Sequence, residues 1–494
     1  MSLAPHLPAL QVVLPLLTAP AAVLLRSGGA AFLLVTAAAW GAFAISLGLW
    51  QQTAGGEVIS YAIGNWPPPW GIELRVDRLS AFVLVLVAGM AAVVLPYCRQ
   101  SIEREIPRDQ HYLFYAMFAL CLTGLLGITI TGDAFNIFVF LEISSLATYV
   151  LIALGRDRRA LVAAYQYLIV GTIGATFIVI GIGLLYLTTG TLNLADIGTR
   201  LPQVSGERPV LAALAFLTVG ICLKLALFPL HQWLPNAYTF APSAVTAFLA
   251  ATATKVSVYV LLRFYFSVFG ESLVFDRLPL PGIMLLLSLA AMFVASAVAA
   301  FQDDLKRLLA YSSVAQIGYI TLGLSFDSQS GLTATIVHLF NHGLTKGALF
   351  MLAGCLVAVA GGSGLARLAG IGRAMPVTAF GIVLGGLSLI GVPGTVGFVS
   401  KWYLVLAALE KGQWWLVMAI VGSSLLAVVY VWRFVEIAWF REPPAGLPAD
   451  RRLPLSLQAP AWLLVAATVY FGLDASFTVG SAAAAAEQLL GMTR

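Results

Sequence analysis

Long apolar stretches separated by short polar connections recur along the whole chain. A stretch of about 20 apolar residues is the length at which an α-helix crosses the hydrocarbon core of a bilayer. The pattern predicts fourteen such segments, near 7–25, 30–50, 78–97, 111–131, 133–154, 160–188, 209–238, 243–268, 281–301, 306–325, 331–360, 377–403, 413–440 and 457–479. The alanine-rich tail from Ser481 is predicted to be a short helix at the membrane surface. The chain is therefore predicted to be an all-α polytopic membrane protein.

Composition supports this class and excludes others. Of 494 residues, 60% are hydrophobic and 10% are charged, against about 25% charged in soluble domains. The four cysteines, Cys98, Cys121, Cys222 and Cys355, form no C-x-x-C pair, so neither a metal site nor a disulfide framework is indicated. The net charge of +5 does not indicate a nucleic-acid partner, because basic residues in short loops set membrane orientation instead.

The basic residues also predict orientation. If the segments alternate in direction, one side holds Arg26, Arg99, Arg104, Arg108, Arg156, Arg158, Arg159, Lys306, Arg307, Arg367, Arg373, Arg441, Arg451 and Arg452. The other side holds Arg75, Arg78, Arg200, Arg208, Arg277, Lys411 and Arg494. The richer side is expected to be cytoplasmic. We therefore predict a multi-pass protein of the bacterial cytoplasmic (inner) membrane with both termini outside.

The stretch 221–242, ICLKLALFPLHQWLPNAYTFAP, combines a lysine with helix-breaking residues. Lys224 lies well inside an apolar segment that Pro229 and Pro235 then interrupt, with His231 between them. Proline removes a backbone donor and breaks or kinks a helix. In lipid, a broken helix carrying a lysine indicates a hydrated cavity, and His231 titrates near neutral pH. The alternative is an ordinary proline kink with a lysine that reaches the interface.

Two sets of five consecutive segments have the same arrangement, in which the fourth segment of each set is broken. The first set spans 111–268, and the second breaks at Gly391, Pro393 and Gly394. Such corresponding interruptions indicate inverted repeats with a site near the membrane midplane. We predict N-terminal helices 1–3 over 1–110, a first repeat over 111–268 (helices 4–8), a second over 269–440 (helices 9–13), and helix 14 with the tail over 441–494. Two half-channels are expected to open to opposite sides.

Lysine is distributed unlike arginine. The chain has six lysines, and Lys224, Lys255, Lys346 and Lys401 fall within apolar segments, whereas the loops use arginine almost throughout. Lysine changes its protonation readily when desolvated, and arginine does not. Groups that must gain and lose a proton in a membrane are therefore expected to be lysines. The alternative is that each lysine snorkels or is paired for structural reasons.

Other titratable residues suggest partners for these lysines. Glu142, a third of the way into its segment, is the predicted acid partner of Lys224, and its approach or withdrawal would switch the lysine; an inert neutral acid is the alternative. His338, His342 and Lys346 are spaced i, i+4, i+8, which places them on one helical face and resembles a proton relay. Zinc binding by the two histidines is the alternative, but no third ligand accompanies them.

Five motifs in order carry a family resemblance. FLEISSLATYVLI, KLALFPLHQWLPNAYTFAPSAVTAFLAATATKVSVYVLLR, DDLKRLLAYSSVAQIGYI, HLFNHGLTKGALFMLAG and GVPGTVGFVSKW resemble the proton-translocating antiporter-like subunits of respiratory complex I, Mrp cation/proton antiporters and membrane-bound hydrogenases. The resemblance implies fourteen helices, inverted repeats and broken helices 7 and 12. It implies Glu142 and Lys224 as the paired acid and base, Lys255 as the connecting lysine, His338 and His342 as the central relay, and Lys401 as the exit lysine. Gly394 departs from the family, which often has a second proline there.

The chain is most similar to the D-type subunit of Mrp antiporters, by its length, its ending soon after the fourteenth helix, and GFVSKWYLV. The N-type subunit of complex I or a hydrogenase-linked homologue is the alternative, and a proton-silent scaffold subunit is an alternative of another class. The resemblance implies no redox cofactor and no metal. It implies other membrane subunits as partners and protons with Na⁺ or K⁺ as transported ions.

Overall fold

The computed structural model describes residues 4–444 and 453–492, and nearly all the elements in them are helices. Up to residue 269 these are η1 (Ala4–His6), α1 (Leu7–Leu25), α2 (Gly28–Thr53), β1 (Ile59–Ala62), η2 (Ile63–Asn65), β2 (Glu73–Val76), α3 (Arg78–Glu105), η3 (Arg108–Gln110), α4 (His111–Ile130), α5 (Ala134–Ala153), α6 (Arg159–Thr189), α7 (Leu194–Val204), α8 (Arg208–Leu225), α9 (Trp233–Phe240), α10 (Ser243–Leu262) and η4 (Arg263–Phe269). The remainder are η5 (Ser272–Asp276), α11 (Leu280–Ala290), η6 (Ala291–Ala295), α12 (Ser296–Ala300), α13 (Leu305–Ser325), α14 (Gln329–Ala360), η7 (Leu365–Leu368), α15 (Ile371–Ala374), α16 (Pro376–Ile390), α17 (Val396–Glu410), α18 (Trp414–Val435), η8 (Glu436–Phe440), α19 (Leu455–Leu473) and α20 (Ser476–Leu489).

The fourteen predicted segments all appear as helices. In the described part of the chain, thirteen helices are long and apolar enough to cross a membrane. The broken pair α16–α17 supplies the remaining segment. Segments 7 and 12 are interrupted, as predicted: α8 ends at Leu225 before α9 begins at Trp233, and α16 ends at Ile390 before α17 begins at Val396. The bounds of the two repeats and their inverted relation stay predictions.

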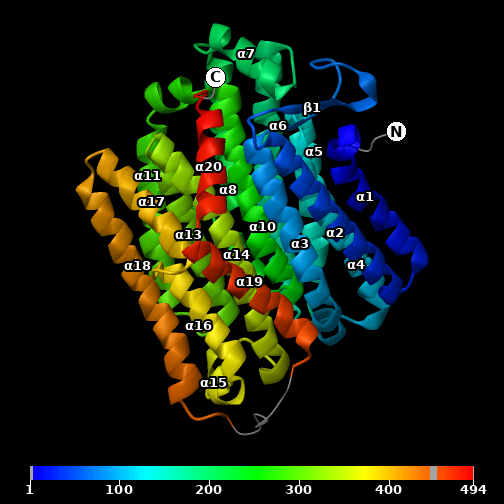
Figure 1. Ribbon diagram of the computed structural model, residues 1–494, viewed down its shortest axis with the longest axis vertical. Coiled ribbons are helices and arrows are strands. Elements are labelled where there is room, and N and C mark those ends of the chain that lie inside the picture. The colour runs from blue at the N-terminus through cyan, green and yellow to red at the C-terminus, as the bar shows by residue number, and fades with distance from the viewer. Residues whose placement is uncertain (1–3, 445–452, 493–494) are drawn as a thin grey trace.

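Helix α14 forms the centre of the bundle. It packs against α3, α10, α13, α16, α17, α19 and α20, and its residues from Gly331 to Leu356 are all buried. Figure 1 shows α7 and the antiparallel β1–β2 hairpin at one end of the bundle, and α15 at the other. We call these the hairpin end and the α15 end. A helix surrounded by protein on all sides can carry polar side chains that lipid would not tolerate.

The C-terminal tail departs from the prediction of a surface helix. The fourteenth segment continues past residue 479, because α20 follows α19 after a short break and packs against α14 and α3. Ala482, Ala485 and Ala486 are fully buried at these contacts. The alanines therefore allow close helix packing instead of marking a surface helix. Three residues used to predict orientation, Arg451, Arg452 and Arg494, lie outside the described residues.

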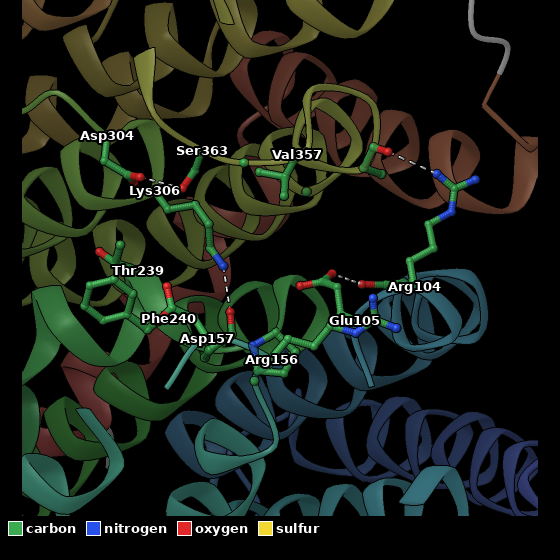
Figure 2. Close-up of a pocket in the computed structure, with 18 of the residues that line it drawn as sticks. Arg104, Glu105, Arg156, Asp157, Thr239, Phe240, Asp304, Lys306, Val357 and Ser363 are labelled. Carbon is green, nitrogen blue, oxygen red and sulfur yellow. Dashed lines mark hydrogen bonds between the residues drawn. The ribbon is translucent and has the colours of Figure 1, made fainter. Parts of the chain in front are cut away.

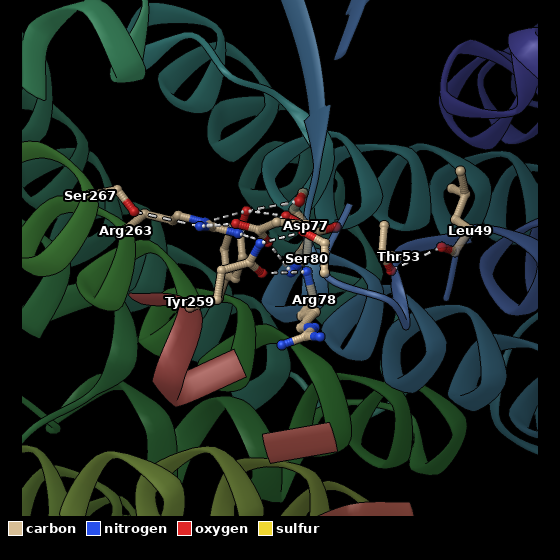
Figure 3. Close-up of polar contacts among 11 residues, drawn as sticks. Leu49, Thr53, Asp77, Arg78, Ser80, Tyr259, Arg263 and Ser267 are labelled. Atoms are coloured by element: carbon tan, nitrogen blue, oxygen red, sulfur yellow. Dashed lines mark hydrogen bonds and ion pairs between the residues drawn. The ribbon is translucent and has the colours of Figure 1, made fainter. Parts of the chain in front are cut away.

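A buried ion pair ties α3 to the end of α10 near the hairpin end. Arg263 donates from Nη1 to Oδ2 of Asp77 at 2.6 Å, and its other nitrogens reach Ser80 and Tyr259 at 2.8 and 2.9 Å. Figure 3 shows Tyr259 and Arg263 projecting together toward Asp77 and Ser80. The two charged side chains are 9% and 10% exposed. Asp77 also caps α3 by accepting the backbone N–H of Ser80.

Replacing Arg263 by leucine is expected to destabilise the protein by about 3–5 kcal/mol, because Asp77 would remain buried without its partner. The apparent unfolding temperature of the detergent-solubilised protein measures this. Replacing both residues, Asp77 by leucine and Arg263 by methionine, should recover much of the loss. The exposed pair Arg441–Glu436 is the matched control, and Glu436→Gln should cost under about 1 kcal/mol. Equal losses at the two pairs would contradict the expectation.

Candidate functional site: a buried row of amines and imidazoles

The first break sets Lys224 beside an acid. Helix α8 ends one residue after Lys224, and Ala226 at its C-terminus has a left-handed backbone. Trp233, which begins α9, donates its Nε1–H to the carbonyl oxygen of Leu223 at 2.9 Å, in the last turn of α8. The Nζ of Lys224 lies 3.6 Å from Oε1 of Glu142 on α5 and 2.9 Å from Oγ of Ser145. The predicted acid and base are thus neighbours.

A small cavity with several polar groups in its lining adjoins Lys224. It has a volume of about 30 Å³ and lies between α5, the Lys224 end of α8 and the middle of α10. Ser144, Ser145, Thr148, Lys224 and Ser257 contribute its polar lining. A volume of about 10–15 Å³ is enough for one water when two or more polar partners are present. Water in this cavity would extend the polar path from Lys224 to α10, the helix that carries Lys255.

Lys255 lies where α10 meets the central helix. It is 1% exposed, and its amine donates to the carbonyl oxygen of Ala250 and, at 3.3 Å, to Oγ1 of Thr254. Gly343 on α14 lets the two helices approach closely, because a Cβ there would lie 3.0 Å from the carbonyl oxygen of Ala251. Lys255 follows Ala251 by about one helical turn on α10.

The polar face of α14 carries His338, His342 and Lys346 on successive turns. The two imidazole rings are stacked with centroids 6.0 Å apart and an interplanar angle of 9°. Nδ1 and Nε2 of His338 bond Ser400 and Gln316 at 2.6 and 2.9 Å. Neither ring nitrogen of His342 has a partner among the described residues. A buried imidazole with two free nitrogens is a site that ordered water would satisfy.

The second break forms the environment of Lys401. Its Nζ donates to the carbonyl oxygens of Leu389 and Ile390, both at 2.9 Å, at the C-terminus of α16. The free carbonyls and the negative dipole end of a helix stabilise an ammonium group. Nζ also lies 4.3 Å from the centroid of the Tyr319 ring, and that ring lies 5.8 Å from the ring of His338. Lys401 therefore adjoins one end of the histidine stack.

Three residues have surroundings that the sequence reasoning did not predict. Pro235 does not interrupt the segment, because it lies in the first turn of α9, where no intrahelical N–H bond is required. His231 lies in the break as predicted, half-buried, but its ring stacks on Phe228 with centroids 5.2 Å apart and joins no hydrogen bond to the row. Lys306 is predicted to be one of the basic residues that set orientation, yet it is 4% exposed and is the fifth buried lysine.

The sequence reasoning also missed the neutral partners. Ser145, Gln316 and Ser400 contact the titratable groups directly. Two of them could have been found by position, because Ser145 follows Glu142 by one helical turn and Ser400 precedes Lys401. Gln316 gave no such signal.

The whole row of titratable groups lies in a region shared with a known family. Residues 131–427 match the family model described as NADH:quinone oxidoreductase/Mrp antiporter, transmembrane region. That range covers more than half of the chain, including both breaks and all six members of the predicted relay. The chain belongs to this family.

Relatives in both branches of the family are similar over most of their length. The N-type subunit of the NADH-quinone oxidoreductase of Desulforudis audaxviator is 44% identical over 93% of each chain. The D-type subunit of the Na⁺/H⁺ antiporter of Alkalihalophilus pseudofirmus is 30% identical over 87% of this chain and 86% of its own. A chain of the Mrp complex from Dietzia sp. DQ12-45-1b superposes with a TM-score of 0.91 at 26% identity, over 100% of this chain and 98% of that one.

A second structural relative comes from a different membrane complex. A chain of the membrane-bound sulfane sulfur reductase, an archaeal respiratory membrane complex, superposes with a TM-score of 0.88 at 28% identity, covering 98% and 97% of the two chains. The family resemblance noted in the sequence is thereby confirmed. The protein is a polytopic membrane subunit whose structural relatives work inside multisubunit assemblies.

Proposed function

We propose that this protein is the proton-translocating subunit of a multisubunit monovalent cation (Na⁺ or K⁺)/H⁺ antiporter. The observation that carries the proposal is the Glu142–Lys224 contact, an acid and an amine 3.6 Å apart inside the bundle. A proton enters a half-channel and loads Lys224. It passes by Lys255 and the histidine stack and leaves by Lys401. Separation of Glu142 from Lys224 lowers the proton affinity of the amine and releases the proton.

The exposure of Glu142 supports the need for a partner subunit. Its side chain is 26% exposed on the face of α5 that also exposes Phe135, Val139 and Leu146. A charged carboxylate facing hydrocarbon at mid-membrane costs about 2.5–3.5 kcal/mol. A neighbouring membrane subunit with a polar group opposite Glu142 would remove this cost, and it would also continue the proton path beyond this chain.

A second candidate function is proton pumping in a complex I-like oxidoreductase. The observation that favours it is the 44% identity to a protein named as the N-type subunit of an NADH-quinone oxidoreductase. The same relay residues would serve, because this function differs in what drives the protons rather than in the path they take. Electron transfer would then be supplied by other subunits.

Everted membrane vesicles that contain the whole complex distinguish the candidates. After a proton gradient is imposed, Na⁺ or K⁺ should dissipate it in the antiporter. An unchanged gradient on cation addition, together with gradient formation driven by an electron donor, would overturn the antiporter in favour of the pump.

Lys255→Met is expected to reduce either activity at least about 100-fold, because a relay that loses a proton-transfer group typically loses about 10²–10⁴ in rate. The vesicle assay above measures it, with immunoblotting to show that the complex is still assembled. Lys411→Met is the matched control, since Lys411 is the exposed lysine and bonds only the backbone of Asp327. Wild-type rates in Lys255→Met would remove that residue from the path.

A further inference from the structure

A polar cavity opens at the α15 end of the bundle, away from the relay. Its volume is about 750 Å³, and it is lined where α3, α9 and α14 end and where α6, α10 and α13 begin. Figure 2 shows Lys306 crossing part of this space toward the backbone beside Phe240, with Glu105 facing it from the other wall. These two buried or half-buried charges of opposite sign have no role in the proposed relay.

Lys306 holds the end of the second half of the broken helix. Its Nζ donates to the carbonyl oxygen of Ala241 at 2.7 Å. Ala241 is the residue that caps the C-terminus of α9, where carbonyls lack intrahelical partners and the helix dipole is negative. The next residue of α13, Arg307, donates to Oδ1 of Asn236 on α9 at 3.1 Å. Helix α13 therefore holds α9 by two cationic side chains.

Glu105 holds the beginning of α10 in the complementary way. Its Oε2 accepts the backbone N–H of Ser243 at 2.9 Å and the hydroxyl of the same residue at 3.2 Å. Ser101 donates to the other oxygen at 2.8 Å. A negatively charged side chain is stabilising at the N-terminus of a helix, as a positively charged side chain is at the C-terminus. The α9–α10 joint at Ala241 and Pro242 is thus fixed from both sides of the cavity.

Helices α13 and α9, which Lys306 joins, each contact a lysine of the relay or its neighbour. One turn beyond Lys306, the carbonyl oxygen of Leu309 accepts the amine of Lys346 at 2.9 Å, and Ser312 accepts it as well. At the other end of α9, the Trp233 indole bonds Leu223, the neighbour of Lys224. Contacts therefore run without interruption from Lys346 through α13 and α9 to the residue beside Lys224.

We propose that Lys306 is a positioning residue that couples Lys346 in the second predicted repeat to the Lys224 site in the first. The amine fixes the end of α9 to α13, so a movement of α13 that follows a change at Lys346 is passed to Trp233 and Lys224. The proposal rests on the proposed function for its transport consequences. Its structural claim, that Lys306 holds the α9–α10 joint, stands apart from transport.

The substitutions Lys306→Met and Lys306→Arg separate positioning from proton carrying. Methionine removes the donor, and the loss of a hydrogen bond made by a charged group should slow transport in the assembled complex at least about tenfold. Arginine retains a cationic donor but does not release protons, so it should restore the rate to within about threefold of wild type. Equal loss in both variants would overturn the proposal and make Lys306 a proton carrier.

Hydrogen–deuterium exchange of the complex gives a readout that does not depend on transport. Backbone amides of residues 236–246 should exchange at least about tenfold faster in Lys306→Met and at the wild-type rate in Lys306→Arg. Unchanged exchange in Lys306→Met would overturn the positioning role even if the complex transports normally. If that variant does not assemble, Glu105→Gln should loosen residues 243–246, and an unchanged rate there would count against the fixed joint.

Discussion

Glu142→Ala and Lys224→Ala are each expected to abolish coupled transport while the complex remains assembled. Removing the acid leaves the Lys224 amine with Ser145 as its remaining hydrogen-bond acceptor, so the approach and withdrawal that switch its proton affinity are lost. Removing the amine takes away the first proton acceptor in the proposed path. A loss of at least about 100-fold is expected for a group that transfers the proton directly.

The gradient-dissipation assay in everted vesicles measures both variants. Immunoblotting of the purified complex separates a transport defect from an assembly defect. Glu436→Ala is the matched control for the acid, because Glu436 pairs with Arg441 at an exposed helix end and should leave transport unchanged. Full activity in either Glu142→Ala or Lys224→Ala would refute the role assigned to that residue.

Gly397→Ala is expected to be the most damaging substitution of a residue without a functional group. A Cβ at Gly397 would lie 1.7 Å from the carbonyl oxygen of Ser388, so α17 must move away from the end of α16. That movement would pull the Lys401 amine from the carbonyls of Leu389 and Ile390. Overpacking a tight contact costs about 1–3 kcal/mol, and a backbone clash belongs at the upper end of that range.

Two measurements follow from this clash. The apparent unfolding temperature of the solubilised protein should fall, and transport should drop at least about tenfold in whatever complex assembles, since the loss of a hydrogen bond from a charged group is of that size. Gly183→Ala on α6 is the control, because a Cβ there meets no atom within 4 Å. If Gly397→Ala behaves like Gly183→Ala, the close approach of α16 and α17 does not matter to Lys401.

The sequence was sufficient to predict the helices because membrane helices follow from local composition. Runs of apolar residues gave all fourteen segments, and glycine and proline at 391–394 gave the second break. Pro235 misled because the effect of a proline depends on its position in a helix: the third residue of α9 needs no intrahelical bond. The prediction of a surface helix for the alanine-rich tail was wrong, because alanine is compatible with a surface helix and with a tightly packed one.

The site was predictable as far as titratable residues in apolar segments identify themselves. Glu142, Lys224, Lys255 and Lys401 are conspicuous because lipid-facing charge is expensive. Lys306 was not conspicuous, because it lies beside Arg307 at the start of its helix, where a basic residue is expected to set orientation. Its burial depends on the packing of α9 against α13. Gln316 and Glu105 depend in the same way on helices distant in sequence, which no local pattern reveals.

The buried position of α20 has a consequence for how the protein is made. Residues 476–489 leave the ribosome after α3 and α14 have been made, and they cover the side of α14 that lies next to α3. Until they dock, that flank of the central helix stands open to lipid. A chain whose synthesis stops before residue 476 therefore has a central helix that is still uncovered on that flank.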